Sequence, residues 1–260
     1  MTRPLAKKEL GQHFLVDQNI LGVIGRLADL ARADVVLEVG PGLGVLTEFL
    51  AERVAHVHAI ELDRSLESRL TERLADHGNI ELHLGDALQL DLGALDPVPT
   101  KLVANLPYNI ATPVVVESFD RAPTLSLWCV MVQREVADRF FAAPSSKAYG
   151  AVSVLVQLRA ERTGFHPVSR TVFRPRPNVD SALVAFRRRK EVLVNAERVK
   201  KVVTAAFAHR RKRLANSLEL AGFASRDEAA MALEAIGRDP AVRAEALAPP
   251  EFVALADALR

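Results

Sequence analysis

The fold is decided by Val35-Val-Leu-Glu-Val-Gly-Pro-Gly-Leu-Gly44, where a short β-branched run ends in three alternating glycines. Such a run is typical of a buried strand, and glycine permits the tight turn that follows it. Residues 46–53 then suit a helix, and residues 54–60 alternate like a second strand. The order strand, glycine turn, helix, strand is a βαβ unit, which predicts a parallel sheet with helices on both faces.

This alternation of strands and helices continues as far as residue 186. Apolar runs predict five further strands, at 80–84, 102–105, 125–132, 152–158 and 182–186. Helical patterns are found at 20–31, behind Asp17 as the N-cap, and at 65–75 and 134–141. We therefore expect an α/β domain over residues 1–188, with a mostly parallel sheet of seven strands.

Only helical patterns follow Arg189. One apolar helical face runs through 199–207, and a second helix covers 214–220 and ends at Gly222. A capping box, Ser225 with Glu228, begins a third helix that stops at Gly237, and Pro249 opens a last one. These patterns predict a small all-helical domain over residues 189–260.

The composition is that of a soluble globular protein, with 49% hydrophobic and 25% charged residues among 260. No apolar run approaches the ~20 residues of a membrane helix. The charged start, Met1–Glu9, has no apolar segment behind it, so we expect no signal peptide. The single cysteine, Cys129, excludes an internal disulfide and a cysteine-cluster metal site. We expect a cytoplasmic protein without a membrane partner, without a metal site, and monomeric, since no feature demands a dimer.

The formal net charge of +2 hides an uneven distribution. Residues 187–213, called the basic segment below, hold 11 Lys/Arg and 2 Asp/Glu, a net charge of +9. Such a strip suits a polyanion docking along it. Solvated helix faces are the alternative interpretation, and charge alone does not decide between the two.

The glycine turn lies where open α/β sheets bind ligands, at the carboxyl end of the first predicted strand. A dinucleotide fingerprint needs a glycine at position 45, which is Val45, so a nicotinamide cofactor is disfavoured. The spacing Gly40-x-Gly42-x-Gly44 behind an acidic residue resembles instead the first motif of S-adenosylmethionine methyltransferases. Without further signals it remains compatible with a plain βα turn.

Two acids strengthen the case for an adenosine-containing ligand. Glu61 ends the second strand, where a carboxylate can accept both ribose hydroxyl protons. Asp86 follows the third strand, where an acceptor can take the adenine amino group. Each alone is compatible with a surface acid or a helix cap, but three strand ends in register, each with a suitable group, indicate one binding site.

Asn105-Leu106-Pro107-Tyr108 follows the fourth strand and resembles the [NDS]-P-P-[YF] motif of methyltransferases that act on ring-conjugated amines. The Asn105 side-chain oxygen and the Leu106 carbonyl can accept the two protons of an exocyclic amine, which frees its lone pair. Pro107 fixes the backbone so that this carbonyl points into the site, and Tyr108 can stack on the base. The alternative interpretation is a strand that leads into a Pro-Tyr turn.

The sequence as a whole resembles one family, the small-subunit (16S) rRNA adenine N6,N6-dimethyltransferases, called KsgA or RsmA in bacteria. The matching blocks run in the family's order from residue 7 to about 255: Gly11–Leu15, Glu38–Gly44, Ile60–Asp63, Gly85–Leu88, Asn105–Ile110, Val132–Val136, Ser146–Gly150, Phe173–Ser181 and Phe207–Leu218. The late blocks are the specific ones, because glycine turns and N-P-P-Y-like tetrads occur in many methyltransferases. The resemblance implies a Rossmann-like class I S-adenosylmethionine-dependent methyltransferase.

The resemblance also implies roles for individual residues. His13 and Leu15 match positions along the methionine end of the cofactor, although many members have Asn in place of His13. The remaining cofactor contacts match Gly40, Glu61, Asp86 and Asn105. Phe173 matches an aromatic residue that stacks on the target base opposite Tyr108; a core phenylalanine before a proline-rich turn is the alternative.

The family adds two methyl groups to each of two adjacent adenosines in the 3′-terminal hairpin loop of 16S rRNA. Loop bases are splayed out at little cost, which suits entry into a narrow site. The implied partner is 16S rRNA within the small ribosomal subunit. Arg187–Lys190 and Arg210–Arg213 would hold its phosphates, and helix capping is the alternative for any single arginine.

Three other functions compete with this interpretation. The erythromycin-resistance methyltransferases perform the same chemistry on large-subunit rRNA, but their blocks usually begin Ser-Gln-Asn-Phe and carry Gly-Ser-Gly or Gly-Ala-Gly. A non-catalytic assembly or transcription factor has no need of the intact Glu61, Asp86 and Asn105. A small-molecule methyltransferase has no use for the basic C-terminal helices.

Overall fold

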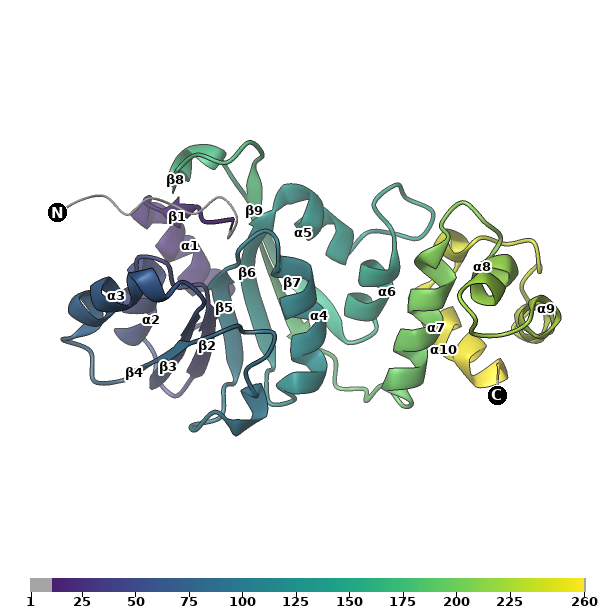
Figure 1. Ribbon diagram of the computed structural model, residues 1–260, viewed down its shortest axis with the longest axis horizontal. Coiled ribbons are helices and arrows are strands. Elements are labelled where there is room, and N and C mark those ends of the chain that lie inside the picture. Colours follow the sequence, from purple (N-terminus) through teal and green to yellow (C-terminus); the bar gives the residue numbers. More distant parts are fainter. Residues whose placement is uncertain (1–10, 260) are drawn as a thin grey trace. The chain divides into compact units, whose positions relative to one another are not determined.

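The computed structural model describes residues 11–259, and its main sheet has seven strands in the order β4-β3-β2-β5-β6-β9-β7 (Figure 1). These strands are β2 (Val35–Val39), β3 (His56–Glu61), β4 (Ile80–Leu84), β5 (Lys101–Asn105), β6 (Leu127–Gln133), β7 (Ala160–Val168) and β9 (Ser181–Arg188). Neighbours from β4 to β6 pair in parallel, and β9 runs antiparallel to β6. The predicted α/β fold with a mostly parallel seven-stranded sheet is confirmed.

Helices cover the sheet because its two faces are both apolar. α1 (Gln18–Leu27) begins after Asp17, whose carboxylate accepts a hydrogen bond from the Asn19 N–H at 2.8 Å. With α2 (Val45–Ala51) it packs on one face, where Ile24 and Leu50 join the core beneath the strands. On the other face lies α4 (Ala111–Arg121), whose Phe119 ring is 4.5 Å from that of Trp128 in β6. The sequence analysis did not predict α4.

Seven further short elements lie between residues 14 and 174. They are β1 (Phe14–Leu15), η2 (Arg64–Leu66), α3 (Glu67–Leu74), η3 (Leu92–Ala94), α5 (Arg134–Phe140), η4 (Arg170–Val172) and β8 (Phe173–Arg174). β1 and β8 form a separate two-stranded antiparallel sheet, in which Leu15 is paired with Phe173. A segment before the first helix is therefore joined to one that precedes the last strand.

One predicted strand is wrong. Residues 152–157 belong to the helix α6 (Ala151–Gln157), and residue 158 is its C-cap. At the N-cap Gly150, the Ser153 hydroxyl accepts a hydrogen bond from the Gly150 N–H at 3.1 Å. A short run rich in valine does not distinguish a buried helix from a buried strand. The seventh strand is β7 instead, which the sequence analysis missed because it lacks an apolar run and only its first and last residues are buried.

Residue contacts divide the chain into two compact units. The first comprises the described residues up to Ala137 with Glu161–Arg188, and the second comprises Asp138–Ala160 with the described residues from Arg189 onward. The sequence analysis assigned 138–160 to the first domain. These residues instead pack with the C-terminal helices, since the buried Tyr149 donates a hydrogen bond from its hydroxyl to the Leu247 carbonyl at 2.8 Å.

The second unit is helical, as the sequence predicts for its C-terminal part. Besides α6 it contains α7 (Ala196–Ala208), α8 (Leu214–Leu220), α9 (Arg226–Ala235), η5 (Ala244–Ala246) and α10 (Pro249–Ala258). The predicted capping box is present, with the Ser225 hydroxyl accepting from the Glu228 N–H and the Glu228 carboxylate accepting from the Ser225 N–H. Phe207 of α7 and Phe252 of α10 join the helices, with ring centroids 5.7 Å apart.

Within residues 11–259, every helix is too short or too polar to cross a membrane. The expectation that no signal peptide is present concerns Met1–Glu9, which lie outside the described residues.

Candidate active site

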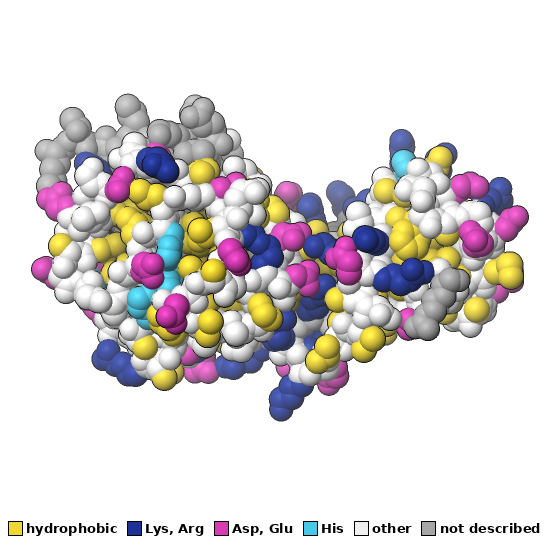
Figure 2. Space-filling model, turned by 60° about the horizontal axis from the view of Figure 1, so that its bottom comes forward, with side chains coloured by type: hydrophobic (Ala, Val, Ile, Leu, Met, Phe, Trp, Pro, Cys, Tyr) yellow, Lys and Arg dark blue, Asp and Glu magenta, His cyan; other side chains and the backbone are white. Residues whose placement is uncertain are grey.

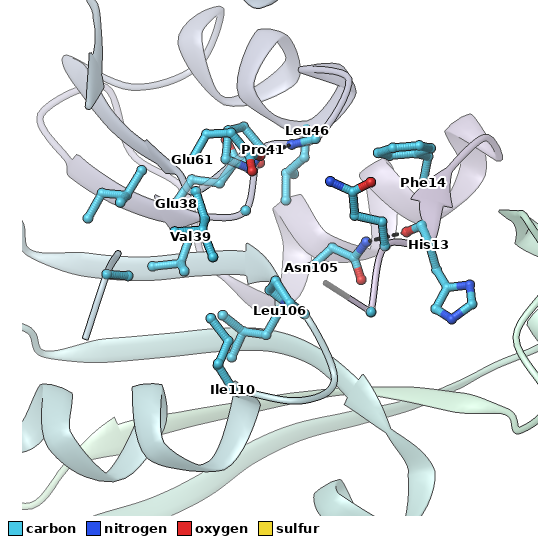
Figure 3. A pocket seen from close by; sticks show the side chains of 18 of the residues that line it. His13, Phe14, Glu38, Val39, Pro41, Leu46, Glu61, Asn105, Leu106 and Ile110 are labelled. Carbon is cyan, nitrogen blue, oxygen red and sulfur yellow. Dashed lines mark hydrogen bonds between the residues drawn. The ribbon is translucent and has the colours of Figure 1, made fainter. Parts of the chain in front are cut away.

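The order of the strands brings the predicted site residues together. The neighbours β4, β3, β2 and β5 are followed or ended by Asp86, Glu61, Gly40 and Asn105, all at the carboxyl edge of the sheet. One pocket is lined by all four, with His13, Leu15, Leu106, Pro107 and Tyr108 also on its wall (Figure 3). Nine of the ten predicted site residues therefore lie on one cavity, at the place where parallel sheets bind ligands.

The glycine turn and the Asn105–Tyr108 segment touch each other. Gly40 has φ +76°, and a Cβ added to it would lie 3.0 Å from Cγ and Cδ of Pro107. Gly42 has φ +59°, and a Cβ there would lie 3.0 Å from the Phe14 ring. Both positions combine a left-handed backbone with contact too close for a side chain. The backbone conformation and the packing of the protein itself therefore favour glycine at both positions.

Glu61 is fixed by two backbone N–H groups. Its Oε2 accepts from Gly42 at 3.0 Å, and its Oε1 accepts from Asp63 at 2.8 Å. Burial raises the pKa of this carboxyl, and these two hydrogen bonds oppose the shift. Since each carboxylate oxygen has a second lone pair, the held Glu61 can still accept the two ribose hydroxyl protons expected of its ligand.

Glu38 is a further acid of this pocket that the predicted site did not include. It is 1% exposed, and burial, with the nearby Glu61 charge adding to it, raises its pKa to about 8. Its Oε2 has no hydrogen-bond partner among the described residues. A buried carboxylate oxygen without a donor is costly unless a ligand supplies one. The cationic sulfonium and amino groups of S-adenosylmethionine fit this acidic pocket.

Asp86 is half-buried, in the loop after β4. Its Oδ1 accepts a hydrogen bond from the Leu88 N–H at 2.9 Å, which fixes the side chain as a local cap. Its second oxygen has no hydrogen-bond partner among the described residues, and Asp86 lines the pocket. The arrangement is compatible with both interpretations given to Asp86, the cap and the acceptor for an adenine amine.

Asn105 is oriented by its own amide nitrogen. Its Nδ2 donates to the His13 carbonyl at 3.1 Å, as the dashed line in Figure 3 shows. A carbonyl only accepts, so the nitrogen must face it and the Oδ1 must face the opposite way. Leu106, 1% exposed, is held by its N–H, which donates to the Met131 carbonyl at 3.1 Å. The fold thus fixes both residues whose oxygens are expected to accept the amine protons.

Tyr108 is held at its far end. Its hydroxyl lies 2.6 Å from Oγ of the buried Ser181, and burial raises its pKa. Its ring centroid is 5.2 Å from that of His13, whose Nδ1 is 2.8 Å from the Pro175 carbonyl. His13 thus supports the site through its backbone carbonyl and through its tilted ring contact with Tyr108, which its expected role at the cofactor did not include.

Phe173 does not line this pocket. It is fully buried, is paired with Leu15 across the β1–β8 sheet, and packs in the apolar core of the first unit. Its ring is therefore not available to stack on a target base in this structure. Its position agrees with the alternative interpretation, a core phenylalanine before a proline-rich turn.

Two functional positions escaped the sequence analysis, for different reasons. Glu38 is part of the glycine motif quoted above. Its position two residues before Gly40 could have placed it in the pocket, but the sequence analysis used it only to define the motif. Ser181 lies 73 residues from Tyr108 in the sequence. No local pattern indicates such a contact, because it depends on β9 lying beside β6.

The basic segment divides into cations that support the fold and cations that face solvent. The Arg188 guanidinium donates to the Leu125 carbonyl at 2.7 Å and lies over Trp128, and Arg210 donates to the Tyr149 carbonyl at 2.7 Å. In contrast, four exposed cations make no hydrogen bond or ion pair with any described residue through their side chains: Lys190, Arg211, Lys212 and Arg213. These four side chains can contact phosphates without losing an interaction of the fold, whereas Arg188 and Arg210 already bind backbone carbonyls.

A model of the ribosomal RNA adenine dimethylase family matches residues 4–255. The chain belongs to this family. The ribosomal RNA small subunit methyltransferase A of Rubrobacter xylanophilus is 47% identical over 252 residues, which cover 97% of this chain and 94% of that protein.

Two solved structures are similar over nearly the whole chain. A dimethyladenosine transferase from Plasmodium falciparum aligns with a TM-score of 0.79 and 25% identity, covering 94% of this chain and 96% of that one. The 23S rRNA methyltransferase ErmE aligns with a TM-score of 0.68 and 30% identity, covering 95% and 99%. The predicted family, its Rossmann-like class I fold and its S-adenosylmethionine-dependent rRNA methyltransferase activity are confirmed.

Proposed function

We propose that this chain transfers methyl groups from S-adenosylmethionine to N6 of two adjacent adenosines in the 3′-terminal hairpin loop of 16S rRNA. The observation that carries the proposal is the anchored Asn105 amide, which turns its oxygen away from the His13 carbonyl while Leu106 and Tyr108 lie on the same pocket. This is the arrangement that an exocyclic adenine amine requires. Dimethylation of each adenosine makes the enzyme part of small-subunit biogenesis.

The cofactor end of the pocket is assigned to the glycine turn and the acids. S-adenosylmethionine supplies an electrophilic methyl group on a sulfonium. Glu61 accepts the ribose hydroxyl protons, Asp86 takes the adenine amino group, and Gly40 lets the ligand approach the backbone. Leu15 and the His13 segment close the methionine end. The buried Glu38 carboxyl, whose pKa is about 8 in the ligand-free protein, would lose its proton beside a cationic ligand, so this site favours a cationic ligand over a neutral one.

The methyl-transfer end is assigned to Asn105, Leu106, Pro107 and Tyr108. An aromatic amine is a weak nucleophile because its lone pair is shared with the ring. Hydrogen bonds from the amine to the Asn105 Oδ1 and the Leu106 carbonyl draw the nitrogen towards tetrahedral geometry and free that lone pair. Tyr108, held by Ser181, stacks on the base. Acceleration then comes from alignment of the amine with the methyl group, and the proton leaves the product without a strong base.

The small subunit is the partner that the relatives favour. The relative named for the small subunit is 47% identical, whereas the 23S rRNA enzyme is 30% identical, each over nearly the whole chain. Gly40-Pro41-Gly42 also departs from the turn of the large-subunit enzymes. The exposed Arg211, Lys212 and Arg213 are assigned to rRNA phosphates. A monomer in the cytoplasm suits this partner.

The test is methyl transfer from labelled S-adenosylmethionine to undermethylated small subunits, with large subunits and free nucleosides assayed in parallel. Label in small subunits alone is expected. Label in large subunits would assign the chain to the erythromycin-resistance type of activity. A protein that binds S-adenosylmethionine and small subunits but labels neither RNA would be a non-catalytic assembly factor.

A further inference from the structure

A group of histidines gathers on β3 and β4, away from the pocket residues. His56 and His58 alternate along β3, Glu81 and His83 alternate along the edge strand β4, and His58 is the register partner of Glu81. Residues two apart in a strand point to the same face, so this pairing gathers the four side chains on one face. Figure 2 shows histidine side chains in a group at the surface, with acidic side chains beside them.

The nitrogen and oxygen atoms of this cluster face one another at short distances. Nδ1 of His58 is 3.1 Å from Nε2 of His83 and 3.5 Å from a Glu81 carboxylate oxygen. The Glu81 carboxylate is also 3.7 Å from Nε2 of His83 and 3.9 Å from Nε2 of His56. One exposed carboxylate therefore lies within 4 Å of three imidazole nitrogens.

Hydrogen bonding determines which nitrogen His58 offers to this cluster. Its Nε2 lies 2.7 Å from the Pro97 carbonyl and must carry the proton, since a carbonyl only accepts. In neutral imidazole the Nδ1 lone pair is then unprotonated and directed at His83 and Glu81. A histidine that donates its other ring N–H to a backbone carbonyl is the usual arrangement of a metal ligand.

A hydrogen bond between two histidines explains only part of the arrangement. The His83 N–H can donate to His58, but Nε2 of His56 is buried and has no hydrogen-bond partner among the described residues. An ion pair with Glu81 does not account for the rest, because its carboxylate lies 3.7 Å from Nε2 of His83 and 3.9 Å from Nε2 of His56, too far for a hydrogen bond. Neutral imidazoles around a carboxylate are the state in which these groups bind a metal ion.

We propose that His56, His58, His83 and Glu81 bind a divalent transition-metal ion, with Zn²⁺ as the best match. Ligand nitrogens about 2.0–2.1 Å from tetrahedral Zn²⁺ lie about 3.4 Å from each other, close to the spacings of this cluster. The ligand atoms of His56, His58 and Glu81 all lie within 4.8 Å of one another, so small rotamer changes complete the site. Imidazole and carboxylate ligands without cysteine suit Zn²⁺, Ni²⁺ or Co²⁺ and disfavour soft-metal sites.

The bound ion would tie the edge strand to its neighbour. β3 ends at the cofactor-pocket residue Glu61, and β4 leads into Gly85 and Asp86 of the same pocket. An ion shared by the two strands holds β4 against β3 without itself touching the pocket. Its role is structural, and the predicted absence of a metal site is revised by this proposal.

The test is a titration of the full chain with Zn²⁺ after treatment with a chelator, with Co²⁺ as a spectroscopic probe. One Zn²⁺ per chain, a rise of the unfolding midpoint with Zn²⁺, and Co²⁺ absorption bands of a tetrahedral site are expected. His56→Gln, at a partly exposed position, and Glu81→Gln, at an exposed one, should each weaken Zn²⁺ binding by at least the roughly 10–100-fold typical of losing an outer-shell partner.

The matched control is His77→Gln, which removes a histidine from the same unit but outside the cluster. This variant should bind Zn²⁺ and gain stability as the wild type does. Either of two results overturns the proposal: wild type that binds no Zn²⁺ at micromolar concentration, or His56→Gln and Glu81→Gln that bind Zn²⁺ as tightly as His77→Gln does. A variant that unfolds without metal is excluded by its circular dichroism before titration.

Discussion

The charged groups of the pocket in the first unit are buried, whereas several of those in the basic segment are exposed. In the pocket, Glu38 and Glu61 are 1% and 5% exposed, and Glu61 is held by two backbone N–H groups. In the basic segment, Arg211, Lys212 and Arg213 are exposed and make no ion pair with described residues. Buried, fixed groups interact strongly with one ligand, whereas exposed cations contribute small, salt-screened increments. Single changes should therefore be severe in the pocket and graded in the basic segment.

The largest effect is expected for Asn105→Ala. This change removes an acceptor that is needed as the amine becomes nucleophilic, and should lower kcat by roughly 10²–10³-fold, the cost of removing one hydrogen-bonding group from a transition state. Cofactor affinity, measured by calorimetry, should stay largely intact. Turnover that remains near the wild-type rate would refute the role assigned to Asn105.

A large effect on stability is expected for Glu38→Gln, and it depends on pH. The folded-state pKa of Glu38 is about 8, above its value of 4.5 in the unfolded chain, so the folded protein holds the extra proton between these values. Ionisation of this carboxyl therefore does not lower the free energy of unfolding below pH 4.5, and the loss of stability grows as pH rises towards 8. At pH 9 the variant should be more stable than the wild type by a few kcal/mol, the order of such a shift.

Thermal unfolding of ligand-free protein from pH 5 to pH 9 measures this difference. S-adenosylmethionine, a cation, should reduce the wild type's loss of stability, because it favours the charged carboxylate. Parallel curves for the two proteins over this pH range would show that Glu38 is not the group responsible.

Glu61→Gln should weaken S-adenosylmethionine binding by about 10–100-fold, since a hydrogen bond to a charged group contributes roughly 1.5–3 kcal/mol. The amide keeps the shape and can still accept from one of the two backbone N–H groups. Glu48→Gln, at an exposed ion pair with Arg73 outside the pocket, is the matched control. An equal loss in both variants would point to general destabilisation.

In the basic segment, the triple change of Arg211, Lys212 and Arg213 to Gln should flatten the salt dependence of small-subunit binding. The log–log slope should fall by roughly one unit for each phosphate that a removed cation had bound. Cofactor affinity should not change. Arg210→Gln is the contrasting variant: it loses its hydrogen bond to the Tyr149 carbonyl and should lower the unfolding temperature instead. An unaltered slope in the triple variant would show that these cations do not bind phosphates and belong to a solvated helix face.

The smallest effect is expected for Ser181→Ala. Loss of the hydrogen bond to Tyr108 costs about 0.5–1.5 kcal/mol, which lowers kcat severalfold without changing cofactor affinity. Because both changes break the same hydrogen bond, Tyr108→Phe added to Ser181→Ala should bring little further loss. Additive losses in this double-mutant cycle would show that the two residues act separately.

Local sequence patterns predicted the parts of the fold and of the site that do not depend on contacts between distant segments. Gly40, Glu61, Asp86 and Asn105 were found because each directly follows or ends a strand, and parallel strands place such residues at one edge. The helix at 151–157 was mistaken for a strand because its local pattern is ambiguous, and the burial of Phe173 depends on pairing with Leu15, 158 positions earlier. Long-range pairing also fixes Ser181 against Tyr108, so no local pattern could reveal it.

The most direct test of the account is the mass of the 3′-terminal hairpin fragment of 16S rRNA, isolated from undermethylated small subunits after incubation with S-adenosylmethionine and this protein. We predict two adjacent N6,N6-dimethyladenosines with the wild type and unmodified adenosines with Asn105→Ala. Methyl groups elsewhere in the RNA, or an equally methylated fragment from Asn105→Ala, would contradict the proposed site.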